Sequence, residues 1–369
     1  MLLSKLLQAV DGKLHNVADR DIVQLVSDSR AVERGSLFFA LAGHADDGRK
    51  YLEEAVHKGA IAVVVEDCLP LDIKEKLQSV VIEQKEQVAF IEVRNIRLAL
   101  ARMAATFFAL QPREIVAVTG TSGKSSVVDF LRQIWQLAGR RAASIGTIGV
   151  QTEKARHAVP LTTLDAITLH KTLAQLAQEG VEDVALEASS HGLKQYRLAG
   201  TELVAAGFTN LGRDHMDYHP TVEDYFLTKM RLFTELLPQG KPALLVQGAP
   251  FAEEAESFLR ANNVNVLTIG ENGNFIQYET KAIQKDKTEI ILKMAGQTQR
   301  LLFPLLGKFQ LENALLAAGF AYITGVPLAQ IVPSLEKLHS VSGRLELVAS
   351  LPEDIKIYID YAHKPEALE

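Results

Sequence analysis

The chain has 369 residues and a formal net charge of -6, with 47% hydrophobic and 23% charged residues. This length allows two or three domains that each bury a core. The acidic balance argues against a general nucleic-acid binder. The single cysteine, Cys68, excludes an internal disulfide framework and suits a reducing compartment. Lys5 interrupts the apolar opening, and nowhere do about 18 apolar residues run together. We therefore expect a cytoplasmic protein without membrane insertion.

Residues 1–110 alternate short apolar runs with helical patterns. Strands are expected over Ile22–Val26, Leu37–Ala42, Ala60–Val65 and Val80–Ile82, and helices over Leu52–Lys58 and Arg97–Leu110. The segment Gln111-Pro112-Arg113 is then typical of a linker, because Pro112 disfavours helix at Gln111. We therefore place a first domain at residues 1–110.

Residues 111–340 repeat an alternation of strand and helix. Strands are expected over Ile115–Val118, Val184–Leu186, Val204–Phe208 and Ala243–Val246. Helical patterns cover 124–138, 165–179, 222–237, 252–261, 310–323 and 328–339. A short antiparallel meander is expected from Ile276–Tyr278, Glu289–Met294 and Gln299–Phe303. The pattern predicts an α/β fold with a mostly parallel sheet, whose ligands bind at the carboxyl ends of the strands.

Residues 341–369 begin at a joint marked by Ser342-Gly343-Arg344. A strand is expected over Ile355–Asp360, and Pro365 fits the first turn of a helix. One strand and one helical turn cannot form a core. We therefore expect this segment to open a third, Rossmann-like domain of about 100 to 150 residues, the rest of which lies beyond Glu369.

A glycine-containing loop, Gly120–Ser126, follows the apolar run Ile115–Val118 and reads Gly-Thr-Ser-Gly-Lys-Ser-Ser. Glycines let the backbone turn tightly and direct N–H groups at phosphate, while Lys124 supplies a charge and Ser125 a hydroxyl for Mg²⁺. The full P-loop spacing would place a glycine where this chain has Val118. The alternative is an ordinary strand-to-helix turn, but the flanking strand and helix favour a nucleotide site.

Acidic and basic side chains follow later strands of the predicted sheet. Glu187 ends the strand Val184–Leu186, where a carboxylate can hold Mg²⁺ directly or through water. The alternative for Glu187 is a helix-capping or surface acid. The segment 213–219 concentrates acids and histidines, among them His215. Lys229 lies on the following helix, and its residue type and position alone favour a surface lysine.

Several of these segments, taken together and in order, resemble the Mur ligase superfamily, and within it the MurE-type UDP-N-acetylmuramoyl-tripeptide synthetases. The matching segments of the second and third domains are Gly120–Ser126, Glu187–Leu193, Asn210–His215, Gly343–Glu346 and Asp360–His363. Those of the first domain are Asp28–Arg30, Gly35–Phe38 and Gly43–Gly48, which resemble the family's uridine-nucleotide domain. The similarity runs over essentially the whole chain. It implies a UDP-MurNAc-binding first domain, a central ATP-binding ligase domain and the start of a C-terminal ligase domain.

The resemblance implies an ATP-dependent amide ligase of peptidoglycan precursor synthesis. Such enzymes add the third amino acid to UDP-N-acetylmuramoyl-L-alanyl-D-glutamate through an acyl phosphate, and split ATP to ADP and phosphate. The expected partners are this UDP-sugar dipeptide, ATP and an amino acid, bound by a monomer. meso-Diaminopimelate is favoured over L-lysine, although the residues that select it would lie beyond Glu369.

The resemblance also implies roles for individual residues. It implies catalytic roles for Lys124, Glu187, His215 and Lys229. Ser125 and Glu187 would hold a first Mg²⁺; His215 and Lys229 would hold a second, with Lys229 converted by CO₂ into a carbamate. Nucleotide contacts would come from Gly120, Thr121, Ser122, Gly123, Lys124, Ser125, Ser126, Asn313, Arg344, Asp360 and His363. The alternative for His363 is a cap of the helix start that follows it.

Substrate contacts are implied in the same way. Ser27, Ser29, His44, Ala45 and Asp46 would lie on the uridine side, and Thr162, Thr163, Ser189, Gln195 and Arg197 would contact the muramoyl peptide. The family usually has Asn-Thr-Thr-Pro where this chain has Leu161-Thr162-Thr163-Leu164, so a contact from that asparagine is not carried over. The alternative for the two threonines is a cap of the helix that follows.

Two other functions compete with this one. A related ligase such as a folylpolyglutamate synthetase is disfavoured by the uridine-type first domain and by the segment 189–193. A catalytically incomplete fragment, which binds UDP-sugar or ATP without completing the reaction, stays open because a third domain would close over ATP.

Overall fold

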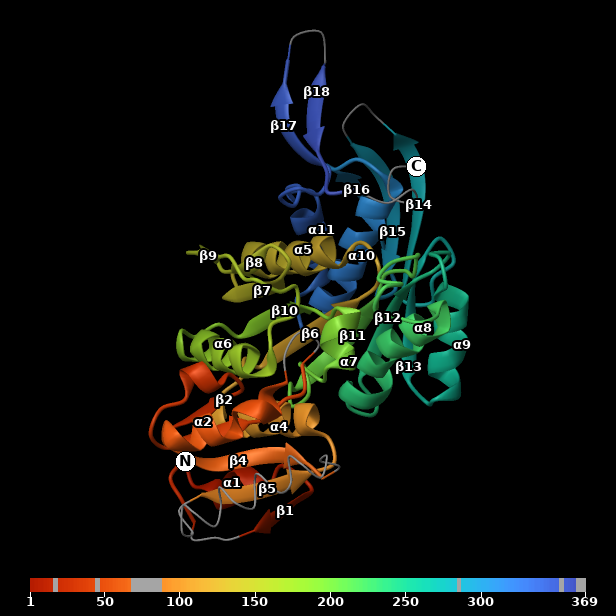
Figure 1. Ribbon diagram of the computed structural model, residues 1–369. Coiled ribbons are helices and arrows are strands. Elements are labelled where there is room, and N and C mark those ends of the chain that lie inside the picture. Colours follow the sequence, from red (N-terminus) through yellow and green to blue (C-terminus); the bar gives the residue numbers. More distant parts are fainter. Residues whose placement is uncertain (16–18, 44–46, 68–87, 284–286, 352–354, 363–369) are drawn as a thin grey trace. The chain divides into compact units, whose positions relative to one another are not determined.

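The computed structural model describes residues 1–15, 19–43, 47–67, 88–283, 287–351 and 355–362 (Figure 1). The backbone groups into two compact units. The first comprises Met1–Leu110, Asp165–Ala174 and Gln195–Gly200; the second comprises Gln111–Leu164, Gln175–Lys194 and Thr201–Glu369. Within the described ranges, no helix is both long and apolar enough to cross a membrane.

The first unit is built on a five-stranded sheet in the order β1-β5-β4-β3-β2. β1 pairs antiparallel with β5, and the other neighbours are parallel. The strands are β1 Gly12–His15, β2 Gln24–Val26, β3 Ser36–Phe39, β4 Ala60–Glu66 and β5 Ala89–Val93, and the α-helices are α1 Leu3–Leu7, α2 Leu52–His57 and α4 Ile96–Phe108. The expected strands and helices are present with shifted ends, except that Val80–Ile82 lies outside the described residues. α1, β1 and β5 were not predicted.

The second unit contains an eleven-stranded sheet in the order β16-β15-β14-β13-β12-β11-β6-β10-β7-β8-β9. Pairing is parallel from β14 to β7, and the outer strands at both edges are antiparallel. The strands are β6 Glu114–Thr119, β7 Ala142–Gly146, β8 Gly149–Gln151, β9 Arg156–His157, β10 Asp183–Glu187, β11 Leu203–Phe208, β12 Pro242–Val246, β13 Asn265–Gly270, β14 Ile276–Ile283, β15 Thr288–Met294 and β16 Gln297–Phe303. The predicted α/β class and the mostly parallel sheet are therefore confirmed.

Helices of the second unit pack around its sheet. They are α5 Lys124–Leu137, α7 Ser190–Lys194, α8 Val222–Arg231, α9 Ala252–Ala261, α10 Lys308–Ile323 and α11 Leu328–Leu335. α6 Ala166–Gln178 is divided between the units, because its residues up to Ala174 group with the first unit. α5, α10 and α11 pack together on one face of the sheet (Figure 1). Val116, Val118 and Leu244 of the sheet are fully buried in the same core as these helices. This packing fixes the start of α5, where the glycine loop enters the helix.

One expectation for the second unit was wrong in detail. The single helix expected over 222–237 is divided, because α8 ends at Arg231 and a π-helical turn continues over Leu232–Leu236. The expected antiparallel meander is confirmed as β14, β15 and β16, and β14 also pairs in parallel with β13. Strands β7, β8, β9 and β13 were not predicted.

The segment after the joint forms an antiparallel hairpin of β17 Glu346–Ser350 and β18 Lys356–Ile359. β18 matches the expected strand, whereas its partner β17 was not predicted. The helix start at Pro365 lies outside the described residues. The division into domains at residues 110 and 340 stays a prediction.

His170 in α6 links the stability of the fold to pH. Its ring is 1% exposed and Nε2 lies 3.0 Å from the Ala199 carbonyl oxygen. Burial lowers the pKa of His170 from 6.5 to about 4, and the bond to Ala199 opposes this only in part. Between pH 6.5 and about pH 4, His170 is therefore protonated in the unfolded chain and neutral in the folded chain. The free energy of unfolding decreases as the pH falls through this range.

We expect the free energy of unfolding to drop by about 2 kcal/mol from this group between pH 7 and pH 5. His170→Gln keeps an N–H donor without a titrating ring and should remove that part of the slope. The measurement is urea unfolding at both pH values, with His339→Gln on the exposed surface as the matched control. An unchanged slope in His170→Gln would contradict the assignment.

Candidate nucleotide and metal site

The loop Gly120–Ser126 connects β6 to α5, and its two glycines are required by its geometry. Gly123 has φ +85° at the start of the helix. A Cβ on Gly120 would lie 1.9 Å from Thr209 Oγ1, and one on Gly123 would lie 2.6 Å from Asn313 Oδ1. Larger residues would therefore displace both the loop and its neighbours.

Lys124 begins α5 and its side chain folds back over the loop. Its Nζ donates to the Gly120 carbonyl at 2.8 Å and to the Thr121 carbonyl at 2.9 Å. The N-terminus of α5 adds the unpaired N–H groups and partial positive charge of a 14-residue helix. A cation at a helix start suits the binding of phosphate.

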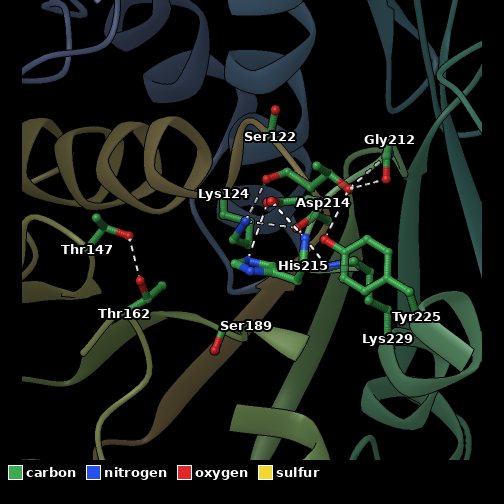
Figure 2. Close-up of polar contacts among 12 residues, drawn as sticks. Ser122, Lys124, Thr147, Thr162, Ser189, Gly212, Asp214, His215, Tyr225 and Lys229 are labelled. Carbon is green, nitrogen blue, oxygen red and sulfur yellow. Dashed lines mark hydrogen bonds and ion pairs between the residues drawn. The ribbon is translucent and has the colours of Figure 1, made fainter. Parts of the chain in front are cut away.

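A second loop, Thr209–Gly212 after β11, is hydrogen-bonded along the glycine loop. Asn210 Oδ1 accepts from the Ser122 N–H at 3.0 Å, and Asn210 Nδ2 donates to the Ser122 carbonyl at 3.3 Å. Thr121 Oγ1 accepts from the Gly212 N–H at 2.9 Å (Figure 2). The two loops therefore form one connected structure, in which the second loop restrains the glycine loop.

Removing the side-chain amide of Asn210 should make the glycine loop less ordered. We expect Asn210→Ala to weaken ATP binding about 30-fold, because two hydrogen bonds that orient Ser122 are lost and each contributes about 1 kcal/mol. Asn262→Ala, which removes an exposed bond to the Phe258 carbonyl, is the matched control. Isothermal titration with ATP measures the effect, and equal affinities in the two variants would refute a role for Asn210.

Glu187 ends β10, which lies next to β6 in the sheet. It is 2% exposed, so the interpretation as a surface acid is wrong. Thr147, directly after β7, donates its N–H to Glu187 Oε1 at 2.8 Å and its hydroxyl to Oε2 at 3.2 Å. Ser125, in the first turn of α5, is 4% exposed. A carboxylate and a hydroxyl are hard oxygen ligands, so these residues fit Mg²⁺ that also takes phosphate oxygens and water.

Lys229 of α8 is 1% exposed, so the surface interpretation is wrong for it as well. Its Nζ donates to the Gly120 carbonyl at 2.9 Å and lies 4.3 Å from the centroid of the Tyr225 ring. Burial raises the pKa of Tyr225 to about 12, so its hydroxyl stays protonated 3.2 Å from Thr121 Oγ1. Lys229 and Tyr225 therefore hold the glycine loop from the side of α8.

His215 lies on the loop before α8, with a backbone φ of +54°. Its Nε2 is 3.3 Å from Asp214 Oδ2, and its ring meets that of His191 edge-on. Figure 2 shows Lys124, Asp214 and His215 close together beside the loop. In the part of the chain that the structure describes, no three His, Cys, Asp or Glu side chains form a metal-binding group. The second Mg²⁺ site, expected on His215 and a modified Lys229, stays a prediction.

The other histidine of this polar segment, His219, has a structural contact. It is fully buried, and its Nδ1 lies 2.6 Å from Asp224 Oδ2 of α8. This bond lowers the pKa of Asp224. His219 thus connects the segment to α8 at Asp224, five residues before Lys229.

Residues predicted for the nucleotide come together around the start of α5. Asn313 packs against Gly123, and its Nδ2 donates to Gln310 Oε1 at 3.3 Å. Gln310 in turn donates to the Arg344 carbonyl, and Arg344 Nη2 lies 3.4 Å from Ser125 Oγ. Arg344 also lies over the Tyr361 ring, and Asp360 accepts from the Leu345 and Ala362 N–H groups. His363 lies outside the described residues.

Predicted peptide contacts gather at the carboxyl end of β10. Thr163 is 3% exposed, and its hydroxyl donates to the Glu187 carbonyl at 2.7 Å and lies 3.0 Å from Ser189 Oγ. Thr162 lies 3.1 Å from Thr147, oxygen to oxygen. The alternative that the threonines cap α6 is disfavoured, because Asp165 accepts from the Thr168 N–H there.

The remaining predicted substrate residues belong to the first unit. Ser29 is 7% exposed and lies beside Glu54 and Lys58, whereas Ser27 is exposed. Arg197 donates twice to Gln195 Oε1. His44, Ala45 and Asp46 lie outside the described residues.

Four residues that shape the site had no role predicted from the sequence: Thr147, Asn210, Tyr225 and Gln310. Asn210 stood in a recognised motif, so its position was available but its contact was not. Tyr225 precedes Lys229 by one helical turn, a spacing that places both on one face of α8.

Known proteins match the chain over both units. The model "Mur ligase middle domain" matches residues 118–321, and "Mur ligase family, catalytic domain" matches residues 21–108. A UDP-N-acetylmuramoyl-L-alanyl-D-glutamate--2,6-diaminopimelate ligase of Mesorhizobium japonicum is 46% identical over 95% of this chain and 70% of its own length. The chain belongs to the Mur ligase family.

Further relatives and solved structures support membership of this family. The protein of the same name from Agrobacterium fabrum is 45% identical to this Mur ligase over 96% of the chain and 70% of its own length. A solved structure of such a ligase superposes with a TM-score of 0.76 at 28% identity, covering 94% of this chain and 68% of its own. A MurF structure from Acinetobacter baumannii, with a TM-score of 0.65 at 20% identity over 99% of this Mur ligase and 74% of its own chain, shares the fold. The predicted family is therefore confirmed.

Proposed function

We propose that this Mur ligase adds meso-diaminopimelate to the D-glutamate of UDP-N-acetylmuramoyl-L-alanyl-D-glutamate, with cleavage of ATP to ADP and phosphate. One observation carries the proposal. The glycine loop, Glu187 and Lys229 meet in a chain that is 46% identical to a ligase named for this reaction. The name of that relative supports diaminopimelate over L-lysine.

The proposed reaction has two steps. A carboxylate oxygen of the substrate attacks the γ-phosphorus of ATP, which releases ADP and forms an acyl phosphate. The amine of the incoming amino acid then attacks the acyl carbon, loses a proton and expels phosphate. The protein must align two anions and offset their repulsion, which is a task for cations and fixed dipoles.

The residues of the site suit these demands. Lys124 and the N–H groups of the glycine loop would bind the β- and γ-phosphates, and Asn210 keeps that loop in place. Thr162, Thr163 and Ser189 would bind the muramoyl peptide at the end of β10. Arg344, Asn313 and Asp360 would contact the nucleotide, as would His363.

Mur ligases are ATP-dependent and use Mg²⁺, which neutralises phosphate charge when bound. We propose Ser125 and Glu187 as holders of one ion, and His215 with a Lys229 carbamate as holders of a second. The carbamate forms when the neutral Nζ of Lys229 attacks CO₂ and loses a proton. It would replace the bond to Gly120 with an anionic oxygen ligand.

All of these residues belong to one chain, so we propose a monomer. ATP and the UDP-linked substrate are cytoplasmic metabolites, so we place the reaction in the cytoplasm.

The test is an assay of the full reading frame with ATP, Mg²⁺, the UDP-muramoyl dipeptide and one amino acid at a time. We expect phosphate release and a new amide with meso-diaminopimelate, detected by mass spectrometry. Turnover with L-lysine alone would reassign the amino acid, and turnover with neither would refute the proposed function.

A further inference from the structure

Thr147 is the residue that fixes the Glu187 carboxylate. Thr147 directly follows β7, and β7 pairs with β10, which ends at Glu187. The backbone of Thr147 therefore lies beside the end of β10. Its N–H and its hydroxyl each contact a different carboxylate oxygen, at 2.8 Å and 3.2 Å. The preceding residue leaves no free space, because a Cβ on Gly146 would lie 2.1 Å from Glu187 Oε1. The carboxylate is therefore held in one plane.

The hydroxyl of Thr147 also lies 3.1 Å from the hydroxyl of Thr162, and Figure 2 shows these two side chains facing each other. A hydroxyl carries one proton, and a carboxylate only accepts. Since Thr147 donates to Glu187, Thr162 must donate to Thr147. The two hydroxyls therefore form consecutive hydrogen bonds, from Thr162 to Thr147 and from Thr147 to the Glu187 carboxylate.

We propose that Thr147 is the positioning residue for Glu187: its hydroxyl orients the carboxylate toward the metal–nucleotide complex. The inference rests on the proposed function, because it assumes that Glu187 holds a divalent cation. Partners that orient a ligating carboxylate typically change metal affinity 10- to 100-fold when they are removed.

Three variants isolate the contact. Thr147→Val has nearly the same shape and keeps the backbone N–H, but it lacks the hydroxyl. Thr147→Ser restores the hydroxyl. Thr162→Val removes the other hydroxyl of the pair and leaves the bonds to Glu187 in place, so it is the matched control.

The experiment measures Mn²⁺ binding by electron paramagnetic resonance, with the full reading frame saturated with a non-hydrolysable ATP analogue. We expect Thr147→Val to bind Mn²⁺ about tenfold more weakly than the wild type. Thr147→Ser and Thr162→Val should stay within about twofold of the wild type. Thermal unfolding checks that the variants are folded, and Thr147→Ala replaces the valine variant if valine is not accommodated.

Mn²⁺ affinity in Thr147→Val that equals the wild type would overturn the inference and leave the proposed function standing. An equal loss in Thr162→Val would also overturn it, because the effect would then follow the loop and not the carboxylate. If the wild type binds no Mn²⁺ with the nucleotide, the proposed function itself fails.

Discussion

Lys124→Met should reduce ATP-dependent phosphate release by at least about 10²- to 10³-fold while the protein stays folded. The Nζ of Lys124 lies over the glycine loop, within 2.9 Å of two of its carbonyl groups. Methionine keeps an unbranched side chain but removes the charge that would offset the phosphates during transfer. The measurement is the rate of phosphate release with all substrates, together with a thermal unfolding curve.

The matched control is Lys154→Met, because Lys154 is exposed in the turn before β9. It removes the same charge from the surface and should leave the rate within about twofold of the wild type. A Lys124→Met enzyme that keeps more than a fifth of the wild-type rate would show that the loop does not bind the transferred phosphate.

Lys229→Met should lower the rate of the reaction without lowering the free energy of unfolding. We expect the rate to fall by at least about 10²-fold, since the proposed carbamate of Lys229, and with it an oxygen ligand for the second ion, cannot form. The free energy of unfolding should stay within about 1 kcal/mol or rise, because a cation that is 1% exposed is replaced by an apolar side chain of similar volume. The measurements are phosphate release and urea unfolding.

Lys241→Met, at an exposed position of the same unit, is the control. Carbon-13 NMR of protein in labelled bicarbonate gives a direct reading, with a carbamate signal expected in the wild type and in Lys241→Met and absent from Lys229→Met. A fully active Lys229→Met enzyme would exclude any catalytic role. Loss of folding without a carbamate signal in the wild type would make Lys229 a structural residue.

The sequence allowed the main frame of the fold to be predicted, because its signals are local. Strand β6, the glycine loop and α5 follow one another within 24 residues, and β-branched runs and helical spacing mark them clearly. β7 and β13 were missed for the opposite reason. β7 reads Ala-Ala-Ser-Ile-Gly, and such small residues carry little strand signal until neighbours on both sides bury them.

The site was predictable where motifs carry it and not where packing decides it. Lys124 and Glu187 were placed by their positions after strands. Lys229 was assigned to the surface by its residue type, yet it shares a helix face with buried Tyr225. The role of Thr147 depends on the pairing of β7 with β10, which brings together residues 40 positions apart. No local sequence pattern predicts the pairing of these two strands.

We propose that this site phosphorylates a carboxylate of the UDP-muramoyl dipeptide. The direct test uses dipeptide whose D-glutamate carboxylates carry oxygen-18, with ATP, Mg²⁺ and meso-diaminopimelate, and mass analysis of the phosphate released. An acyl phosphate requires one labelled oxygen to pass into phosphate for each amide formed, with ADP as the other product. Unlabelled phosphate, or AMP with pyrophosphate, would contradict the account.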